Sequence, residues 1–245
     1  MKSKKIIETY INDTPISTLD LCLTERPKIP SPQMRVERIE VPGRNGSLTK
    51  KDAYDDITIT CKFSVLLDYH HKGRAEKRNV KHLLSEIKGM LYQAKKLNFE
   101  DDDRFYKVKS VDVFNIDNRI EQYGEFDASF ECDPFLYYET QEKEIQNGGK
   151  IANIGTVESA PIITVNGSGD GTLTVAGSSI AISGQTAPII IDCEEMTAYS
   201  LSQGVAVNQN RKIRGDLPLL PVGESIVSWD GGISTVTIDG RWRDL

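Results

Sequence analysis

The residues best suited to chemistry in this sequence are its three histidines and four cysteines, and their spacing does not build a metal site. His70 and His71 are neighbours, so their side chains point in different directions, and His82 is the remaining histidine. The cysteines lie far apart and form no Cys-x-x-Cys pair; they are Cys22, Cys61, Cys132 and Cys193. Because zinc sites draw their ligands from close, regular spacings, we predict no metal site and buried, reduced thiols.

Other motifs that carry catalysis or bind phosphate are missing as well. The sequence has no Gly-x-Ser-x-Gly elbow, no His-Glu-x-x-His helix and no dinucleotide-binding glycine pattern. The glycine-rich segment 166–171 lacks a following Gly-Lys-Ser/Thr, so we interpret it as a hairpin turn between two strands. The acidic segment 100–103 lacks the residue order of a calcium loop and is typical of a solvated turn. We therefore predict no catalytic residue, cofactor or metal.

The charge balance limits the classes of partner. The chain has 245 residues with 30 basic and 36 acidic side chains, a net charge of −6. A general nucleic-acid binder would carry a basic excess, so this class is disfavoured. No apolar run reaches the roughly 18 residues of a membrane span, and no long apolar segment follows the basic N-terminus. We therefore expect neither membrane insertion nor a signal peptide.

The two halves of the chain differ in composition, which predicts two domains, 1–139 and 140–245. The first holds 23 basic and 24 acidic residues, and the second holds 7 and 12. The second half is rich in Gly, Ser, Thr, Val and Ile. The polar stretch 139–150 ends in a glycine pair, so we interpret it as a linker or an exposed connecting strand.

The first half predicts one helix packed on a sheet. Apolar residues at a 3.6-residue period, from Val80 to Leu97, indicate a helix over about 76–97, and lysines near its end suit the negative pole of the helix dipole. Three alternating segments indicate strands, at 57–65, 105–114 and 126–132. A tight glycine turn lies at Val41 to Ser47.

The second half predicts an antiparallel sandwich. Short apolar strands recur with frequent glycine turns, and no helical period is present. The strands are expected at 162–165, 172–175, 180–182, 189–191, 226–227 and 236–238. Ser200 to Pro218 is the longest candidate insertion. The predicted fold class is therefore mainly β, with one main α-helix.

Taken in order, these features resemble the distal tail protein family of long-tailed, non-contractile phages that infect Gram-positive bacteria. Each motif is short, and their shared order spans nearly the whole chain. The residues that carry the resemblance are Val41-x-Gly43-Arg44-x-Gly46, the strand Tyr54 to Val65, the helix end Leu91 to Leu97, Phe105-Tyr106, the strand Tyr123 to Phe135, Asn153-x-Gly155-Thr156, Ser159-x-Pro161, Ile189 to Asp192 and Arg241 to Leu245.

The resemblance implies an assembly protein of the virion. Its N-terminal β-sandwich-like domain would form a hexameric ring, with the turn 41–47 introducing the first main strand pair and the strand through Tyr138 leading to the second domain. The C-terminal domain would be a galectin-like β-sandwich. The ring would join the tail tube protein to the tail-tip protein, which often carries the cell-wall-degrading activity. The C-terminal domain would face the periphery, where receptor-binding proteins can attach in some relatives. DNA would pass the lumen without specific binding, and assembly would take place in the host cytoplasm. Candidate ring or partner contacts are Arg44, Asn45, His70, His71 and Arg74.

Two alternatives from other classes remain open. A carbohydrate-binding module that contacts host cell-wall saccharide would need an exposed aromatic side chain. Trp229, at a predicted turn, is the candidate for that role, although it could equally be a packing residue near a strand end, and Trp242 is expected to be packed. A hydrolase rests only on the abundance of carboxylates, none of which is singled out by its neighbours.

Overall fold

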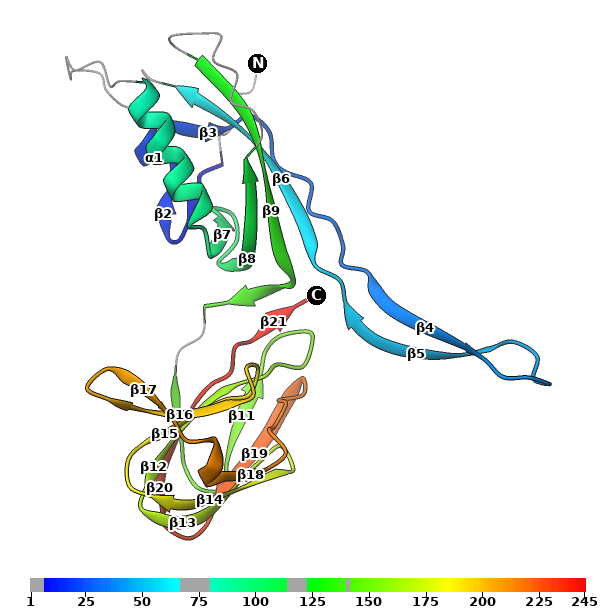
Figure 1. Ribbon diagram of the computed structural model, residues 1–245, viewed down its shortest axis with the longest axis vertical. Helices are drawn as coiled ribbons and strands as arrows, with labels where there is room; N and C mark the ends of the chain where they lie inside the picture. Colours follow the sequence, from blue (N-terminus) through cyan, green and yellow to red (C-terminus); the bar gives the residue numbers. More distant parts are fainter. Residues whose placement is uncertain (1–6, 67–79, 114–122, 140–141) are drawn as a thin grey trace. The chain divides into compact units, whose positions relative to one another are not determined.

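The computed structural model describes residues 7–66, 80–113, 123–139 and 142–245. The chain divides into two compact units, one of residues 1–136 with Leu245 and one of residues 137–244. The first unit contains the helix α1 and a long sheet, and the second contains two further sheets (Figure 1). The predicted fold class, mainly β with one main helix, is confirmed.

The sheet of the first unit is built around two long antiparallel strands, β6 and β9. The strand order is β2-β1-β7-β8-β9-β6-β3. Ile59 lies opposite Phe130, and Phe63 lies opposite Phe126, in the β6–β9 pair. The bounds are β1 Thr9–Ile11, β2 Thr14–Pro15, β3 Leu21–Leu23, β6 Ile57–Leu66, β7 Lys96–Phe99, β8 Arg104–Val113 and β9 Tyr123–Tyr138, with a short 3₁₀ helix η1 at Ile16–Leu19.

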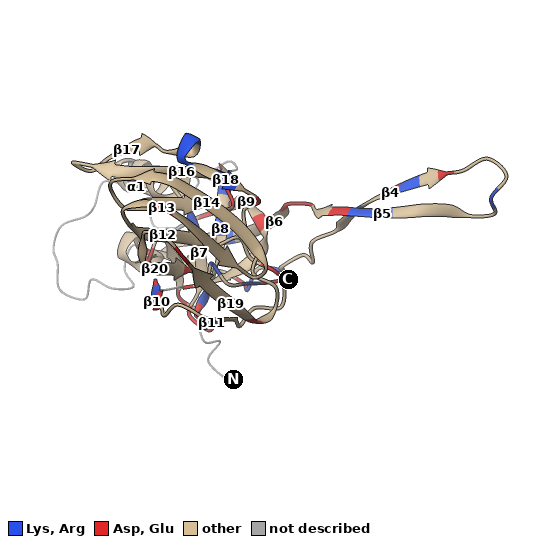
Figure 2. Ribbon diagram, turned by 90° about the horizontal axis from the view of Figure 1, so that it is seen from below, with Lys and Arg blue, Asp and Glu red and all other residues tan. Residues whose placement is uncertain are grey.

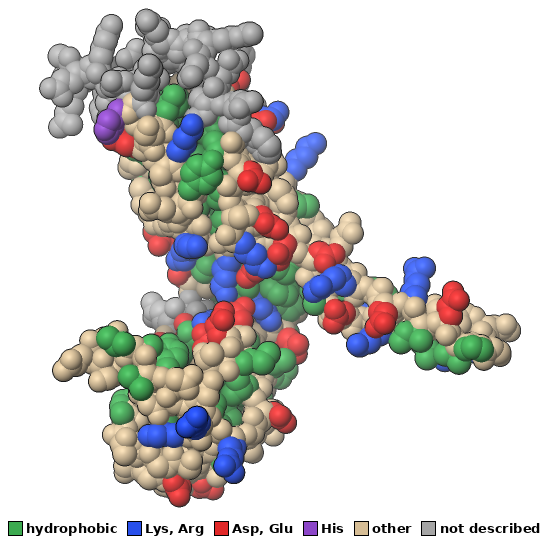
Figure 3. Space-filling view, in the orientation of Figure 1, with side chains coloured by type: hydrophobic (Ala, Val, Ile, Leu, Met, Phe, Trp, Pro, Cys, Tyr) green, Lys and Arg blue, Asp and Glu red, His purple; other side chains and the backbone are tan. Residues whose placement is uncertain are grey.

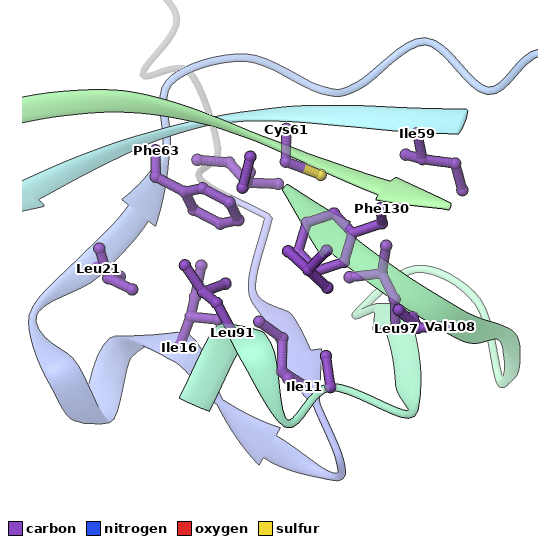
Figure 4. Packing of buried hydrophobic residues seen from close by; sticks show 14 of the residues in the cluster. Ile11, Ile16, Leu21, Ile59, Cys61, Phe63, Leu91, Leu97, Val108 and Phe130 are labelled. Carbon is purple, nitrogen blue, oxygen red and sulfur yellow. The ribbon is translucent and has the colours of Figure 1, made fainter. Parts of the chain in front are cut away.

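The core of this unit lies between one face of the sheet and α1, which spans Val80–Tyr92 (Figure 4). Alternation puts every second side chain of β6 and β9 on this face. The ring of Phe63 stacks on Phe126 at 5.4 Å between centroids and meets Phe130 edge-on at 6.4 Å. The helix covers them with side chains spaced one turn apart: Leu83, Ile87 and Leu91. Burial of each such side chain stabilises the fold by about 1.5–3 kcal/mol.

The predicted C-terminal end of the helix is wrong. The helix ends at Tyr92, and Leu97 lies in β7, where it is fully buried. Leu97 is apolar because its side chain in β7 enters the same core as the helix residues. In the sequence it therefore matched the helical period by position alone. The expected contribution of lysines to the last turn is also wrong, since Lys95 and Lys96 follow the helix. The predicted start, 76–79, lies outside the described residues.

A side chain from another element holds the chain where the helix ends. The amide nitrogen of Asn12 donates to the carbonyl oxygen of Gln93 at 2.9 Å. Its amide oxygen accepts from the backbone N–H groups of Lys95 at 2.7 Å and Lys96 at 3.1 Å. These bonds satisfy backbone groups that a continued helix would have paired internally. They fix the exit from α1 into β7.

A separate two-stranded sheet, β4 (Met34–Glu40) and β5 (Ser47–Tyr54), extends away from the main sheet of this unit (Figure 1). The predicted strand from Tyr54 to Val65 is therefore divided, with Tyr54 ending β5 and β6 beginning at Ile57. The turn 41–47 is correctly predicted as a turn, but it joins β4 to β5 rather than introducing the main strand pair.

The second unit is a sandwich of two antiparallel sheets around one core. The six-stranded sheet has the order β10-β20-β12-β15-β16-β17, and the five-stranded sheet has the order β11-β19-β13-β14-β18. The bounds are β10 Lys143–Ile145, β11 Gly149–Asn153, β12 Ile162–Gly167, β13 Gly169–Val175, β14 Ser178–Gln185, β15 Ile189–Asp192, β16 Thr197–Ser202, β17 Val205–Asn208, β18 Ile213–Gly215, β19 Gly223–Trp229, β20 Ile233–Asp239 and β21 Arg243–Asp244, with a 3₁₀ helix η2 at Asn210–Lys212.

The glycine-rich segment 166–171 is not a hairpin turn, which corrects the prediction. It carries the chain from β12 in one sheet to β13 in the other. Close backbone approach explains its glycines, because a Cβ on Gly167 would lie 2.3 Å from the carbonyl oxygen of Gly232. Crossing between the sheets lets both strands contribute to the shared core.

The stretch 139–150 is only partly a connection. Its residues Lys143–Ile145 form β10, which pairs with β20, and Ile145 is buried in the core. The alternative of a linker throughout is therefore wrong, whereas Lys143 and Glu144 are exposed residues of a strand that also places Ile145 in the core. The segment closes one edge of the six-stranded sheet.

Candidate interaction surfaces

The β4–β5 hairpin, residues 34–54, is the most exposed element among the described residues of the first unit, and we refer to it as the arm. Nearly all of its residues are exposed, including the large apolar side chains Val36, Ile39, Val41 and Leu48, which retain 39–45% of their accessible surface. Both strands carry basic and acidic residues, Arg and Glu on β4 and Lys and Asp on β5 (Figure 2). A two-stranded sheet without a core on either face has little to stabilise it in water.

One face of the arm is apolar near its tip. Ile39 pairs directly with Leu48, so the two side chains lie on the same face, and Val41 continues that face beyond the strand. On the same face, one step nearer the base of the arm, Glu37 pairs with Lys50 at 3.9 Å between carboxylate oxygen and ammonium nitrogen. Figure 3 shows hydrophobic side chains gathered along the outer part of the arm. This face offers a contact surface of apolar residues bordered by charge.

The base of the arm is fixed to the main sheet. The Tyr54 ring meets the Phe135 ring of β9 edge-on at 5.9 Å. The backbone N–H of Asp55 donates to the Gln33 carbonyl oxygen at 2.8 Å, and the Asp55 carboxylate lies 3.3 Å from the Arg35 guanidinium. The arm therefore emerges from a defined point of the sheet.

The tip of the arm carries two of the predicted contact residues, Arg44 and Asn45, and both are exposed. The turn is closed by a hydrogen bond from the Arg44 N–H to the Val41 carbonyl oxygen at 3.1 Å. Gly43 and Gly46 adopt φ of +79° and +77°, a conformation that favours glycine. The other predicted contact residues, His70, His71 and Arg74, lie outside the described residues.

The cysteines of the two cores are packing residues with protonated thiols. Burial raises the pKa of Cys61, Cys132 and Cys193 to about 12, because the neutral thiol is favoured away from water. For Cys193 the charge of the neighbouring Asp192 adds to this effect. The described cysteines are free of disulfides. None of the three buried thiols is therefore placed to act as a nucleophile.

The residues that carry the sequence resemblance in the second half meet in the structure and hold it closed. The carboxylate of Asp244 accepts from the Thr156 backbone N–H at 2.9 Å and from the Tyr138 hydroxyl at 2.8 Å. A Cβ on Gly155 would lie 2.2 Å from the Arg243 carbonyl oxygen, so the close approach requires glycine. These motif residues join the start and end of the sandwich unit.

An ionic cluster also links the C-terminal segment of the sandwich unit to the end of β15. The Arg241 guanidinium donates to both carboxylate oxygens of Asp192, at 2.9 and 2.7 Å, and to Glu194 at 3.1 Å. Burial alone would raise the pKa of Asp192, but hydrogen bonds from Arg241 and from the N–H groups of Glu194 and Glu195 together hold it below its usual value. Such a paired carboxylate is a structural group rather than a proton donor or acceptor.

The acidic turn 100–103 is likewise occupied by basic partners. Asp102 accepts from the Arg104 side chain at 2.8 and 2.9 Å, and these bonds hold its pKa below the usual value. Asp101 pairs with Arg26. Within residues 7–66, 80–113, 123–139 and 142–245, no group of three or more His, Cys, Asp or Glu residues is arranged to hold a metal ion. No helix in this part of the chain has the length and apolar composition of a membrane span.

The tryptophans of the sandwich unit are both partly buried. Trp229 ends β19 and packs against the core, and its backbone N–H and carbonyl group bond to the side chain of Asn147. Trp242 also packs against this core. The structure thus places Trp229, the candidate sugar-facing residue, at the edge of the core with part of its surface accessible.

The fold has counterparts among phage proteins. The Dit protein of phage SPP1, described as a paradigm of the hub adsorption apparatus in phages that infect Gram-positive bacteria, superposes with a TM-score of 0.63 and 11% identity over 96% of this chain and 99% of that one. Chains of the phage p2 baseplate in its activated conformation superpose with TM-scores of 0.53 with strontium and 0.52 with calcium, each at 10% identity over 95% of this chain and 97% of that one.

No protein-family model matches the chain, and no curated protein matches its sequence. The structural likeness extends over nearly the full length of both chains in each comparison. The resemblance to the distal tail protein family that the sequence motifs indicated is therefore confirmed at the level of the fold.

The arm was missed as an element by the sequence reasoning. The local signal was weak. Charged residues interrupt the apolar residues of Met34–Glu40, and Ser47–Tyr54 contains Lys50, Lys51 and Asp52, so neither segment shows regular alternation. The glycine turn between two short segments was the available hairpin signal, and charge on both faces of each segment predicts that neither face is buried.

Proposed function

We propose that this protein is a structural hub of a phage tail tip. The observation that carries the proposal is the fold shared with SPP1 Dit over 96% of this chain and 99% of that protein. Because both units and their order take part in that likeness, it concerns the whole chain rather than one common module. The residues described above supply packing, closure and exposed surface, which suits a role in assembly.

In this proposal, six copies close into a ring that joins the tail tube protein to the tail-tip and receptor-binding apparatus. The tail-tip protein would carry any cell-wall-degrading activity, and receptor-binding proteins would attach at the periphery. The net charge of −6 favours passage of DNA through the lumen without tight binding. The protein would be assembled in the host cytoplasm and would become a component of the virion.

The arm supports self-assembly on physical grounds. A ring closes when one surface of each copy meets a different surface of the next copy. The apolar side chains Ile39, Val41 and Leu48 would be covered in such a contact, which would stabilise it by roughly 1 kcal/mol for each side chain. The charged residues beside them would set the register of the contact.

The proposal is tested by native mass spectrometry and electron microscopy of the full chain at high concentration. We expect a six-subunit mass and rings with six-fold symmetry. The double variant Ile39→Glu, Leu48→Glu should remain folded but lose the ring, because it places charge in the apolar contact. The matched control is Ile154→Glu, Ile226→Glu, which makes the same change at exposed apolar positions of the other unit.

A wild-type chain that stays monomeric, alone and with its tail tube and tail-tip partners, would contradict the proposal. Rings that persist in the Ile39→Glu, Leu48→Glu variant would remove the arm from the contact. The carbohydrate-binding alternative is tested on the same samples with a glycan array, where a sugar signal abolished by Trp229→Ala would favour it.

A further inference from the structure

The sandwich unit has an exposed surface where edge strands of its two sheets come together. β17 is the last strand of the six-stranded sheet, and β18 is the last strand of the five-stranded sheet. The short helix η2 joins them and packs against both β14 and β16. We call this surface the sandwich edge; it consists of Val205, Val207, Arg211, Lys212 and Arg214.

One part of the sandwich edge is apolar and carries no charge. The stretch 197–210 contains no acidic or basic residue, and it includes the whole β16–β17 hairpin. Val205 and Val207 share one face of the hairpin and are 66% and 43% exposed, and Leu201 is exposed on the other face. Hydrophobic side chains are visible on this hairpin in Figure 3. Edge strands usually carry lysine, proline or a bulge that prevents further pairing. β17 has none of these, so its outward backbone groups are open to another strand.

The other part of the sandwich edge is basic. Arg211 and Lys212 lie in η2, and Arg214 lies in β18; they are three of the seven basic residues in 140–245 (Figure 2). None of the three forms an ion pair with a residue that the structure describes, whereas Lys150, Arg241 and Arg243 do. The acidic residue that follows them, Asp216, is exposed. A positive surface thus adjoins an uncharged strand edge.

We propose that the sandwich edge binds an extended segment of an unlike protein, which adds to β17 as a further strand. The segment would have apolar side chains at alternate positions to cover Val205 and Val207. It would also carry acidic residues near its N-terminal end. Antiparallel addition puts that end beside Arg211, because η2 follows the C-terminal end of β17.

Charge identifies the occupant as an unlike protein rather than a second copy. The other edge strands of the described sheets carry no net negative charge: β2, β3 and β10 are neutral overall, and β11 is basic. The arm strands are neutral or basic as well. A pure polyanion would use the basic residues but would leave the apolar hairpin uncovered. A strand with apolar and acidic side chains would cover both the apolar edge of β17 and the basic residues beside it.

This inference goes beyond the proposed ring and does not require it. It concerns an edge of the sandwich unit, which folds around its own core. A chain that binds a strand without forming rings would refute only the ring, and a ring that binds no strand would refute only this inference. The mass of the assembly, and hence its number of subunits, is therefore measured in each binding sample.

The test uses the full chain and a synthetic peptide, Glu-Asp-Glu-Thr-Val-Thr-Val-Thr, with a fluorescent label. Anisotropy should show saturable binding that weakens with added salt. A peptide with lysine at the three acidic positions should bind at least tenfold more weakly. A scrambled peptide of the same composition, which breaks the alternation, and polyglutamate should also bind more weakly. Backbone amide signals of 205–208 should shift when the first peptide is added.

Two variants separate the parts of the surface. Arg211→Gln, Arg214→Gln should weaken binding at least fivefold and reduce its salt dependence, while the matched control Lys143→Gln, Lys150→Gln should not. Val205→Glu, Val207→Glu should abolish binding, and circular dichroism establishes whether this variant remains folded. If it unfolds, Val205→Thr, Val207→Thr replaces it and should still weaken binding.

Three results would overturn the inference. The first is equal binding of the alternating and scrambled peptides, and the second is polyglutamate binding as tight as that of the strand peptide, which would indicate a polyanion site. The third is self-association through β17. It would be detected if, without peptide, the Val205→Glu, Val207→Glu variant formed smaller assemblies than the wild-type chain. The absence of any peptide binding to the wild-type chain would overturn it as well.

Discussion

The first unit contains two pairs of antiparallel strands that illustrate opposite uses of alternation. In the β6–β9 pair, every second residue enters a core, and Phe63 and Phe130 are fully buried. In the arm, apolar residues also recur along the strands, but Ile39 and Leu48 remain about 40% exposed. Pairing of backbone groups is therefore common to both, while burial is not. The arm lacks the stabilisation that a core provides and is suited to acquire it from a partner.

The largest effect is expected at the centre of the β6–β9 core. Phe130→Ala should lower the free energy of unfolding of the first unit by about 3–5 kcal/mol, because it removes a buried ring and leaves a cavity. Urea unfolding followed by circular dichroism measures the change. A loss below about 1 kcal/mol would contradict the packing described here and would weaken the contrast with the arm.

A smaller effect distinguishes a buried ion pair from an exposed one. Arg241→Met should cost about 2–3 kcal/mol, since it leaves the largely buried Asp192 without its partner. The matched change in the arm, Glu37→Gln, should alter stability by less than about 0.5 kcal/mol, because both partners of the Glu37–Lys50 pair are exposed. Equal costs for the two variants in thermal unfolding would contradict the contrast.

The same pair gives a dependence on pH with a definite sign. The pKa of Asp192 is lower in the folded protein than its usual value, so its contribution is present above the unfolded pKa of about 3.9 and is lost as the pH falls through the folded pKa. The stability difference between the wild type and Arg241→Met should therefore shrink from pH 7 toward pH 2. A difference that grows on acidification would reverse this assignment.

The smallest effect on stability is expected at the apolar face of the arm. Ile39→Thr, Leu48→Thr should change the free energy of unfolding of the dissociated chain by less than about 0.5 kcal/mol per residue, because neither side chain enters a core. Urea unfolding at low protein concentration measures this, and ring formation should decline in the same variant. A cost comparable to that of Phe130→Ala would show that the arm packs within its own subunit.

Much of the strand pattern could be predicted from the sequence, because alternation follows directly from the geometry of a strand. The alternating segment 57–65 lies within β6, and the segment 126–132 lies within β9. The candidate surfaces were less accessible to prediction. Ser200 to Pro218 was identified as a candidate insertion, yet it supplies edge strands to both sheets of the sandwich. Edge position depends on which strands pair, and pairing between distant segments leaves no local pattern.

The sequence by itself determined the local preferences: a mainly β chain, one amphipathic helix and turns at glycines such as Gly43 and Gly46. The tertiary structure decided where those elements end and what they face. Asn12 fixes the end of the helix by bonding to residues more than eighty positions away. Where the chain changes sheets, Gly167 must be glycine because the facing backbone at Gly232 leaves no room for a side chain. Local preferences arise from neighbours in the sequence, whereas ends, edges and exposure arise from contacts that only the folded chain creates.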